Sequence, residues 1–596
     1  MSLRTLQALL AGSLASVFAA PAAALPGGED VFALSDGVFG ELGVDSASAY
    51  DPTRDCFLVA YIYQSATLFG PVPQVRVRFI DAATGADVGI GEIEISEESA
   101  GTFEPIDEPD IVYNPELDEF YVVWAGLEDD FNREILGQRL RAEDGFEIGA
   151  DMRLSDMGLG TDMALAAFDP QVAYNPNAGE YMVAWSGSDN TLGLAVGALE
   201  IFIQRVDAAT GDEVGPNDMP VSRMGQSWGA NEFDAYRPQI AYNPVLDEYL
   251  VVWSGDTDGA GFGDELFTVF GQRMGVDGVG ITPGDWLAGE FDNFPISPVG
   301  GCEHVALVYC AASQRFFVAW QDSGALGGEQ EIYGLLLDAA DYSPLGAPFR
   351  ISSAGPDGDT AYFAQAPYAA YDEARDEVLV VWQSDADEAA AGDATDIYGQ
   401  WVDVATGLEV GEDDLRLSTT DGAGSLPLSS YEPAAGYDTL RRRMLVSWST
   451  EQDFGSPTPG PSQSFATFVA SPGAVEMIRL GEPANPNALL AGATSGPVLG
   501  ATWDPRIDHA SFAPDALLDV LGISSQPANV PTPEGTLLAL FGTGSTLLTA
   551  APGEAFVAPL PDEASLVGLE LTAQGAAVTA TSFALSNALD LVLGSH

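Results

Sequence analysis

The stretch Tyr242-Asn-Pro-Val-Leu-Asp-Glu-Tyr-Leu-Val-Val-Trp253 returns six more times, in altered form, between residues 50 and 448. The copies begin at tyrosines that are spaced by 61 to 68 residues: Tyr50, Tyr113, Tyr174, Tyr242, Tyr309, Tyr371 and Tyr437. A fixed period of this length is typical of a repeat architecture. We therefore expect seven structural units of about 65 residues each.

Two further motifs recur between these anchors. A Gly-Gln-Arg or Ile-Gln-Arg segment follows the tryptophan in several units, and a short piece such as Arg153-Leu-Ser155, Arg350-Ile-Ser352 or Arg416-Leu-Ser418 closes them. We interpret the recurring polar residues of the first segment as hydrogen-bonding residues within or between units: Gln138, Gln204, Gln272, Gln400, Arg139, Arg205 and Arg273. The tryptophans end short apolar runs, which indicates core packing rather than a platform for sugars.

Each unit is predicted to contain four strands. The Asn-Pro step favours a turn after the first strand. The run from Tyr249 to Trp253 is apolar on both faces, as in a strand packed between two layers. The Asp-Ala-Ala-Thr-Gly segment ending at Gly211 supplies a glycine for a bulged hairpin before the fourth strand. Four antiparallel strands per repeat predict an all-β, seven-bladed β-propeller.

We expect the propeller to span residues 25–480, with a small C-terminal β-sandwich over residues 481–596. Either residues 31–36 or Glu476 to Leu480 must complete the last blade. Closure by the N-terminal segment would join the two ends of the array. In the tail, short apolar runs alternate with turns such as Pro531-Thr-Pro533, which favours a sandwich.

Residues 1–24 have the pattern of a secretory signal peptide. Arg4 precedes an apolar run from Leu6 to Ala20, and small residues at Ala22 to Ala24 form a cleavage site. The segment is too short for a stable membrane span, and no other transmembrane segment is expected. The mature protein should be secreted, to the extracellular medium, the cell surface or the periplasm.

The units resemble the Val-Val-Trp repeats of large secreted bacterial surface proteins, through Tyr-Asn-Pro, Glu-Tyr-Leu-Val-Val-Trp and Tyr-Gly-Gln-Arg. The tail from Leu566 to Gln574, with Leu585 to Leu591, looks like a C-terminal β-domain shared by secreted proteins of environmental bacteria. This resemblance implies a propeller fold and an extracellular location. It implies no set of catalytic residues, because these families are functionally uncharacterised.

The composition is strongly acidic. There are 89 Asp and Glu residues against 21 basic residues, all of which are arginine, and the formal net charge is -68. Such a surface repels nucleic acid and anionic lipid, and it favours cations or a basic partner. A general adaptation for solubility or salt explains the charge equally well. The partners left open are an extracellular protein or a polysaccharide, and the oligomeric state is open too.

Acidic residues recur in the connections after the second strands of the units. In a propeller, the first-to-second and third-to-fourth turns share one face, and the longer connections share the other. We expect these acids on that second face, as ligand- or cation-binding candidates: Glu128, Asp129, Asp130, Asp189, Asp256, Asp258, Asp322, Asp385 and Asp387. Carboxylates at short spacing suit calcium, although no unit carries a complete calcium loop.

The sequence therefore favours a secreted or cell-surface binding protein that presents this acidic face, with a cation as a possible aid. The alternative is an extracellular carbohydrate-active enzyme, a glycoside hydrolase or lyase, that uses acidic residues at the mouth of the propeller channel. An enzyme predicts that two or three carboxylates and an Arg or Tyr converge there. A binding protein predicts dispersed acids and aromatics on the loops.

The remaining reactive residues are few. His304, His509 and His596 are the only histidines, too few and too scattered for a zinc site or a catalytic triad. The three cysteines, Cys56, Cys302 and Cys310, are too few for a disulfide framework. A single disulfide between Cys302 and Cys310 stays open.

Overall fold

The structure is a computed structural model. It describes residues 31–34, 42–67, 70–96, 107–127, 133–157, 165–189, 198–222, 224, 234–256, 267–281, 294–297, 301–323, 328–385, 395–418, 429–451, 463–471, 473–491, 496–510, 512–540, 545–561, 566 and 569–594. The chain divides into two compact units, with the division between Val469 and Ala470. The division lies about ten residues before the boundary expected from the sequence. The expected signal peptide lies outside the described residues.

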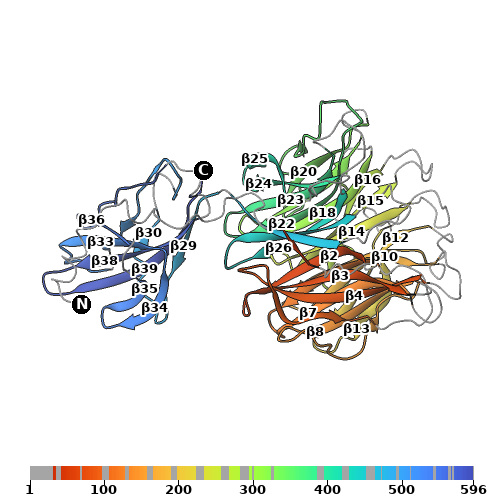
Figure 1. The fold of residues 1–596 in the computed structure, drawn as a ribbon, viewed down its shortest axis with the longest axis horizontal. Coiled ribbons are helices and arrows are strands. Elements are labelled where there is room, and N and C mark those ends of the chain that lie inside the picture. Colours follow the sequence, from red (N-terminus) through yellow and green to blue (C-terminus); the bar gives the residue numbers. More distant parts are fainter. Residues whose placement is uncertain are drawn as a thin grey trace. The chain divides into compact units, whose positions relative to one another are not determined.

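The described part of the first unit holds seven four-stranded antiparallel sheets, and no helix (Figure 1). The first three sheets are β2 (Leu42–Asp51), β3 (Cys56–Thr67), β4 (Gly70–Asp81) and β5 (Asp87–Glu94); β6 (Asp107–Asn114), β7 (Glu119–Leu127), β8 (Arg133–Arg141) and β9 (Met152–Arg153); and β10 (Ala167–Asn175), β11 (Glu180–Gly187), β12 (Glu200–Asp207) and β13 (Glu213–Pro220).

The next three sheets repeat this order. They are β14 (Ala235–Asn243), β15 (Glu248–Asp256), β16 (Phe267–Gly275) and β17 (Phe294–Pro295); β18 (Cys302–Cys310), β19 (Arg315–Asp322), β20 (Glu331–Asp338) and β21 (Phe349–Arg350); and β22 (Ala364–Asp372), β23 (Glu377–Ser384), β24 (Asp396–Asp403) and β25 (Leu408–Arg416). The last sheet contains β26 (Ser429–Asp438), β27 (Arg443–Glu451) and β28 (Gln463–Ala470), and its fourth strand is β1 (Phe32–Ala33).

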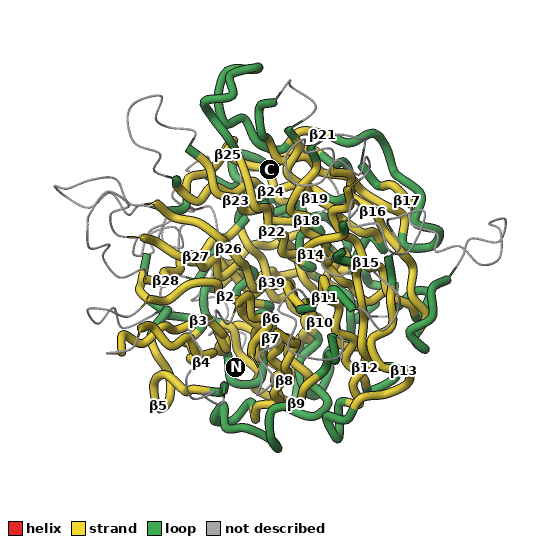
Figure 2. Tube along the Cα trace, turned by 90° about the vertical axis from the view of Figure 1, so that its right-hand side faces the viewer, coloured by secondary structure: helices red, strands yellow, loops and turns green. Residues whose placement is uncertain are grey.

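The sheets form a closed ring of blades. Each first strand contacts the first strand of the next sheet, and β26 returns to contact β2. Figure 2 shows these first strands near the centre of the unit and the fourth strands, such as β5, β13 and β25, near its rim. The all-β propeller fold expected from the sequence is confirmed.

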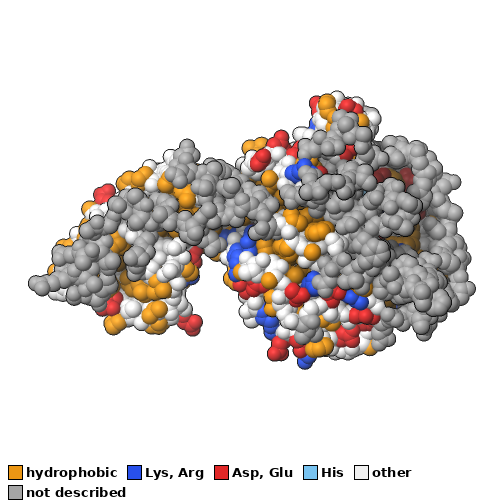
Figure 3. Space-filling model, viewed as in Figure 1, with side chains coloured by type: hydrophobic (Ala, Val, Ile, Leu, Met, Phe, Trp, Pro, Cys, Tyr) orange, Lys and Arg blue, Asp and Glu red, His pale blue; other side chains and the backbone are white. Residues whose placement is uncertain are grey.

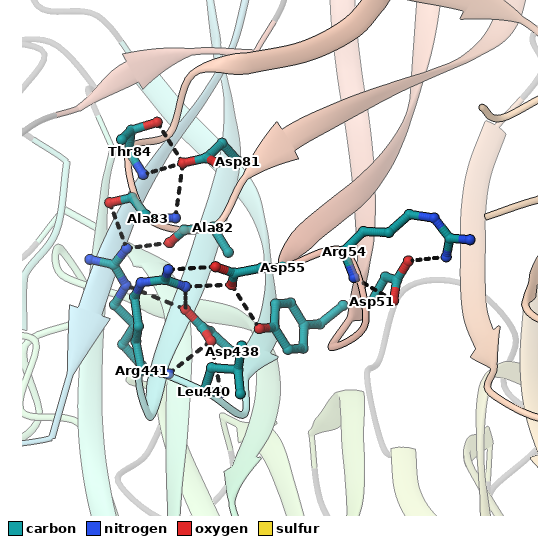
Figure 4. A network of polar contacts seen from close by, with 12 residues as sticks. Asp51, Arg54, Asp55, Asp81, Ala82, Ala83, Thr84, Asp438, Leu440 and Arg441 are labelled. Carbon is teal, nitrogen blue, oxygen red and sulfur yellow. Dashed lines mark hydrogen bonds and ion pairs between the residues drawn. The ribbon is translucent and has the colours of Figure 1, made fainter. Parts of the chain in front are cut away.

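The N-terminal segment completes the last blade. Phe32 and Ala33 pair with Ala466 and Phe465 of β28 in antiparallel register. The alternative segment, Glu476 to Leu480, does not do so, because β29 (Val475–Arg479) pairs with β39 (Phe583–Val592) in the C-terminal unit. The first and last blades are also joined by an ion pair between the Arg441 guanidinium and both oxygens of Asp55, at 2.5 and 2.6 Å (Figure 4).

The core of the propeller consists of clusters between neighbouring sheets. The second strand of each blade is apolar on both faces because a neighbouring sheet covers each of them; β15 is buried along its whole length. The repeated tryptophans lie in these clusters with at most 1% of their surface exposed: Trp124, Trp185, Trp253, Trp320, Trp382 and Trp448. Their interpretation as core residues is confirmed.

The recurring polar residues hold strands and blades together, as expected. Arg139, Arg205 and Arg273 each form a two-bonded ion pair with the first glutamate of the second strand of their own blade. Arg139 also donates to the Ala209 carbonyl of the next blade, at 2.9 Å. The side-chain amide of each recurring glutamine donates to a backbone carbonyl of its own blade.

The closing Arg-x-Ser motif has a buried carboxylate as its partner. Glu134, at the start of β8, accepts hydrogen bonds from Ser155 Oγ at 2.5 Å and from Arg153 Nη2 at 2.6 Å. Glu331 likewise accepts hydrogen bonds from Ser352 Oγ and Arg350 Nη2. Burial nevertheless raises the pKa of both carboxyls to about 7.

The C-terminal unit is a separate β domain. Its main sheet has the order β29-β39-β38-β33-β36, with β33 (Leu518–Ser524), β36 (Thr546–Ala550) and β38 (Glu570–Val578). Shorter pairs accompany the sheet: β30 (Leu489–Leu490) with β32 (Arg506–Ile507), β31 (Thr502–Trp503) with β37 (Ala558–Pro559), and β34 (Pro527–Thr532) with β35 (Gly535–Ala539). Trp503, Ile507 and Leu489 from these pairs pack with Leu521 and Leu589 of the sheet.

Candidate functional site

Every first strand of the propeller is interrupted by a β-bulge near its beginning. The register shifts at Asp45, between Asp107 and Asp110, between Phe168 and Gln171, between Tyr236 and Gln239, at His304, between Gln365 and Tyr368, and between Tyr431 and Ala434. Bulges re-aim side chains and are frequent beside active sites. Here they recur around the central channel, at the end where the longer connections leave the sheets.

The first residue of the bulge has a left-handed backbone in six of the blades, with φ between 41° and 53°. We call these six the bulge ring: Asp45, Asp169, Arg237, His304, Ala366 and Glu432. Such a conformation costs about 1–3 kcal/mol for a non-glycine residue and is found where function or packing requires it. In five units a proline follows the position, and a bulge tolerates proline because no ladder bond is lost there.

Side chains of the preceding blade hold the bulges in place. The Arg237 amide donates to Ser186 Oγ at 2.9 Å, and Ser186 Oγ in turn donates to Asp169 Oδ2 at 3.2 Å. The Glu432 amide donates to Gln383 Oε1 at 3.2 Å. Contacts between blades thus hold the backbone of these bulges.

The bulge ring opens onto a cavity of about 190 Å³ in the channel. The residues at which regular pairing resumes after each bulge line the same cavity, and we call them the second ring: Ser46, Asp110, Gln171, Gln239, Val305, Tyr368 and Ala434. Seven strands that are far apart in the sequence therefore bring carboxylates, an arginine, a histidine and a tyrosine together.

Asp110 is the carboxylate of the second ring. Its Oδ1 accepts from the Ile111 amide at 2.9 Å, and its Oδ2 accepts from the Val172 amide of the next blade at 2.8 Å. Burial outweighs these two bonds and raises the pKa of Asp110 to about 6. Burial, and then the charge of Asp110, also raise the pKa of Tyr368, whose phenol therefore stays protonated at neutral pH.

Arg237 and His304 lie in contact in the bulge ring. Arg237 Nη1 is hydrogen-bonded to His304 Nε2. Burial, and then the Arg237 charge, lower the pKa of His304 to about 3. His304 is therefore a neutral imidazole at physiological pH and accepts the bond from the guanidinium.

A second cavity, of about 360 Å³, adjoins the first one. Its apolar wall includes Phe168, Tyr236 and Phe267, and it shares Arg237 and His304 with the channel cavity. The Tyr236 and Phe267 rings meet edge to face, with centroids 5.9 Å apart. We call this cavity the aromatic lobe. A mostly apolar cavity with a few converging polar groups is typical of a small-molecule or glycan site.

The acidic candidates from the sequence do not form this site. Asp189, Asp256 and Asp322 are buried at the ends of second strands, with 2–6% of their surface exposed. Asp322 accepts from Trp320 Nε1 at 3.4 Å and Asp385 from the Phe363 amide at 2.7 Å, both in their own blade. The other candidates lie outside the described residues: Glu128, Asp129, Asp130, Asp258 and Asp387.

Within the part of the chain that the structure describes, no group of three or more His, Cys, Asp or Glu side chains could hold a metal ion. On the propeller face in Figure 3, acidic side chains lie interspersed with arginines. Calcium binding, which the sequence left open, thus has no group of ligands among these residues. Nor does any described helix have the length and apolar character needed to cross a membrane.

Cys302 and Cys310 do not form the disulfide that the sequence left open. Both thiols are free and buried. They lie at opposite ends of the nine-residue strand β18, which separates them by roughly 26 Å at about 3.3 Å per residue.

The sequence does carry a signal for the channel residues, which the strand patterns did not reveal. The residue five positions before each leading tyrosine belongs to the bulge, and its neighbours repeat while its own type changes: Asp45, Glu108, Asp169, Arg237, His304, Ala366 and Glu432. A variable residue in an otherwise regular repeat indicates a position at which core packing does not determine the residue type. Without the closed ring, however, nothing indicates that these positions meet.

No family model matches the chain, and no curated protein matches it. Similar solved structures include the polysaccharide lyase Uly1, with 8% identity over 77% of this chain and 95% of that chain and a TM-score of 0.42. An α-L-arabinofuranosidase from Fusarium graminearum has 12% identity, coverage of 61% and 94%, and a TM-score of 0.38. The propeller of Dos1 has 9% identity, coverage of 74% and 95%, and a TM-score of 0.38. At these values the likeness concerns the fold alone and carries no argument about function.

Proposed function

We propose that this protein is a secreted enzyme that cleaves glycosidic bonds of an extracellular polysaccharide at the mouth of the propeller channel. One observation carries the proposal: Asp110 and Asp169 line one cavity together with Arg237 and Tyr368. This is the convergence that distinguishes an enzyme from a protein with dispersed binding loops. The acidic connections, on which a binding function was expected to rest, supply no described residue to it.

Asp110 is the proton donor in this proposal. Cleavage of a glycosidic bond needs one carboxyl group that stays protonated near the working pH and a second carboxylate that stays ionised. With a pKa of about 6, Asp110 is largely protonated in mildly acidic solution. The amides of Ile111 and Val172 hold its carboxyl group in one orientation.

Asp169 is the second carboxylate. It lies on β10, next to the β6 strand that carries Asp110, and the two strands are tied by the bond from the Val172 amide to Asp110. The Ser186 hydroxyl donates to Asp169 Oδ2 at 3.2 Å and orients its carboxylate. Asp169 would activate water or attack the sugar directly.

The aromatic lobe would hold a neighbouring sugar unit. Phe168, Tyr236 and Phe267 present ring surfaces on which the apolar face of a sugar can pack. The same lobe favours glycan binding without cleavage as a second candidate function, because aromatic packing needs no catalytic carboxylate.

The test is incubation of the purified protein with a panel of soluble and insoluble polysaccharides. New reducing ends without ultraviolet absorbance indicate hydrolysis, and absorbance from unsaturated uronate ends indicates elimination by a lyase. Retention in the pellet without any release supports the binding candidate and contradicts the enzyme.

The Asp110→Asn variant should lower kcat about 100-fold or more, since general acid catalysis contributes on that scale. Activity of the unmodified protein should fall as the pH rises through about 6, because the acid must be protonated. The matched control is Asp212→Asn, an exposed aspartate on the third-to-fourth-strand turn, which should keep full activity. Full activity of Asp110→Asn would contradict the assignment.

A further inference from the structure

Arg237 is one of the few described arginines of this acidic chain without an ion pair. Most described arginines form ion pairs: Arg139 binds Glu119, Arg205 binds Glu180 and Arg273 binds Glu248. Arg237 has no ion pair with any residue that the structure describes, although acidic residues outnumber basic ones by 89 to 21. Arg237 differs from the other described arginines without an ion pair, such as Arg315 and Arg506, because it lines the channel cavity and the aromatic lobe.

The surroundings of Arg237 keep its charge available. Among the residues that the structure describes, its side chain forms one hydrogen bond, from Nη1 to His304 Nε2. His304 is neutral and does not cancel the charge. A guanidinium has five N–H donors, so four remain for a ligand.

The backbone fixes where this charge lies. Arg237 has φ of 51° in its bulge, and its amide is held by Ser186 at 2.9 Å. The side chain lines both the channel cavity and the aromatic lobe. It therefore shares one cavity with the proposed catalytic carboxylates and another with the apolar wall formed by residues such as Phe168 and Phe267.

We infer that Arg237 binds an anionic group of the glycan, a carboxylate or a sulfate ester, so that the substrate is an acidic polysaccharide. The inference rests on the proposed function and adds the substrate class. Arginine suits this role because its planar fork matches the geometry of an oxyanion. A neutral glycan would leave the charge of Arg237 without a counterpart.

The other charges around the cavity limit what can bind. Asp45, Asp169 and Glu432 lie in the same ring, and Glu303 lines the lobe. At physiological ionic strength, exposed charges are screened beyond about 8 Å, so the net charge of the surface opposes a polyanion only weakly at this depth. The nearby carboxylates restrict binding to a single anionic group beside Arg237.

The test is a binding measurement by calorimetry with the Asp110→Asn variant, in which turnover should be about 100-fold or more slower. The probes are oligogalacturonate and oligoglucuronate with their carboxyl-reduced counterparts, and a sulfated galactan oligosaccharide with its desulfated counterpart. We expect at least one acidic probe to bind about 10-fold or more tightly than its neutral counterpart, as a charge-assisted hydrogen bond provides. The carboxylate and sulfate pairs identify the group.

Adding Arg237→Gln should remove this preference and leave the affinity for the neutral counterpart unchanged. The control is Arg141→Gln, which changes an arginine with 51% side-chain exposure at the end of β8 and should retain the preference. Equal affinity for charged and neutral probes, or no binding of any acidic probe, would overturn the inference.

The two proposals fail separately. Cleavage of a neutral glycan without charge preference would leave the enzyme standing and remove the acidic substrate. Charge-dependent binding that disappears in the Arg237→Gln variant, without cleavage of any glycan by the unmodified protein, would support the acidic ligand and contradict the enzyme.

Discussion

Closure of the ring by β1 can be tested at Leu34. This side chain is fully buried between the first and last blades. Its amide donates to the Ser464 carbonyl at 2.8 Å, and its carbonyl accepts from Arg78 Nη1 at 2.6 Å. Because both backbone groups are held, the segment cannot move inward to fill a cavity left by a shorter side chain.

Leu34→Ala removes three carbons. At about 0.8 kcal/mol for each buried carbon, the transfer term alone is about 2.4 kcal/mol, and the unfilled cavity raises the total to about 3 kcal/mol or more. The free energy of unfolding, from urea titration followed by tryptophan fluorescence, should fall by this amount. The signal reports on the propeller because six of its blades carry a buried tryptophan in the second strand.

Two controls separate closure from a general loss of apolar area. Leu440→Ala, at a turn residue with 54% of its surface exposed, should change stability by no more than about 0.5 kcal/mol. Met477 lies in β29, the strand that does not close the ring, and is 41% exposed. Met477→Ala should therefore change the free energy of unfolding equally little. If Leu34→Ala unfolds at the same urea concentration as the unmodified protein, the N-terminal segment does not complete the last blade.

Two further outcomes follow from buried groups. Without reductant, the unfolded chain should release three reactive thiols and the folded chain none, because all three cysteines are free and buried; one thiol after unfolding would indicate a disulfide. Burial raises the folded-state pKa of Glu134, Asp218 and Glu331 to about 7, above their unfolded values near 4. Protonation therefore favours the folded state, and the urea midpoint should fall as the pH rises from about 5.5 to about 8; a midpoint that rises over this range would contradict the assignment.

The motifs of the sequence correspond to contacts inside or next to one blade. In Tyr242-Asn243-Pro244, the asparagine side chain accepts from the Val245 amide at 3.0 Å and the tyrosine hydroxyl donates to Asp247 at 2.6 Å. Such bonds span a few residues, and the bond from a turn amide to the Asn or Asp side chain recurs in the copies that carry one of these residues after the tyrosine. That is why the period and the run to Trp253 were sufficient to predict strands, turns and core.

The acidic candidates that the structure describes lie elsewhere than in the channel cavity, for a related reason. A charged residue that follows an apolar strand is predicted to be exposed when only the sequence is known, because its neighbours in space are unknown. Asp322 is instead buried at the end of β19, where it accepts a hydrogen bond from the indole of Trp320. Burial of a polar group depends on partners that the tertiary structure supplies.

By itself, the sequence determined that this chain is a β-propeller with a further β domain, because strand alternation, turn residues and repeat period are local properties that survive without knowledge of neighbours. Only the tertiary structure decided where chemistry can occur. Asp110, Asp169, Arg237 and Tyr368 come from different blades and lie up to 258 positions apart in the chain, from 110 to 368. They share one cavity because ring closure directs the beginning of every first strand toward a common channel, and no pattern within a single repeat contains that geometry.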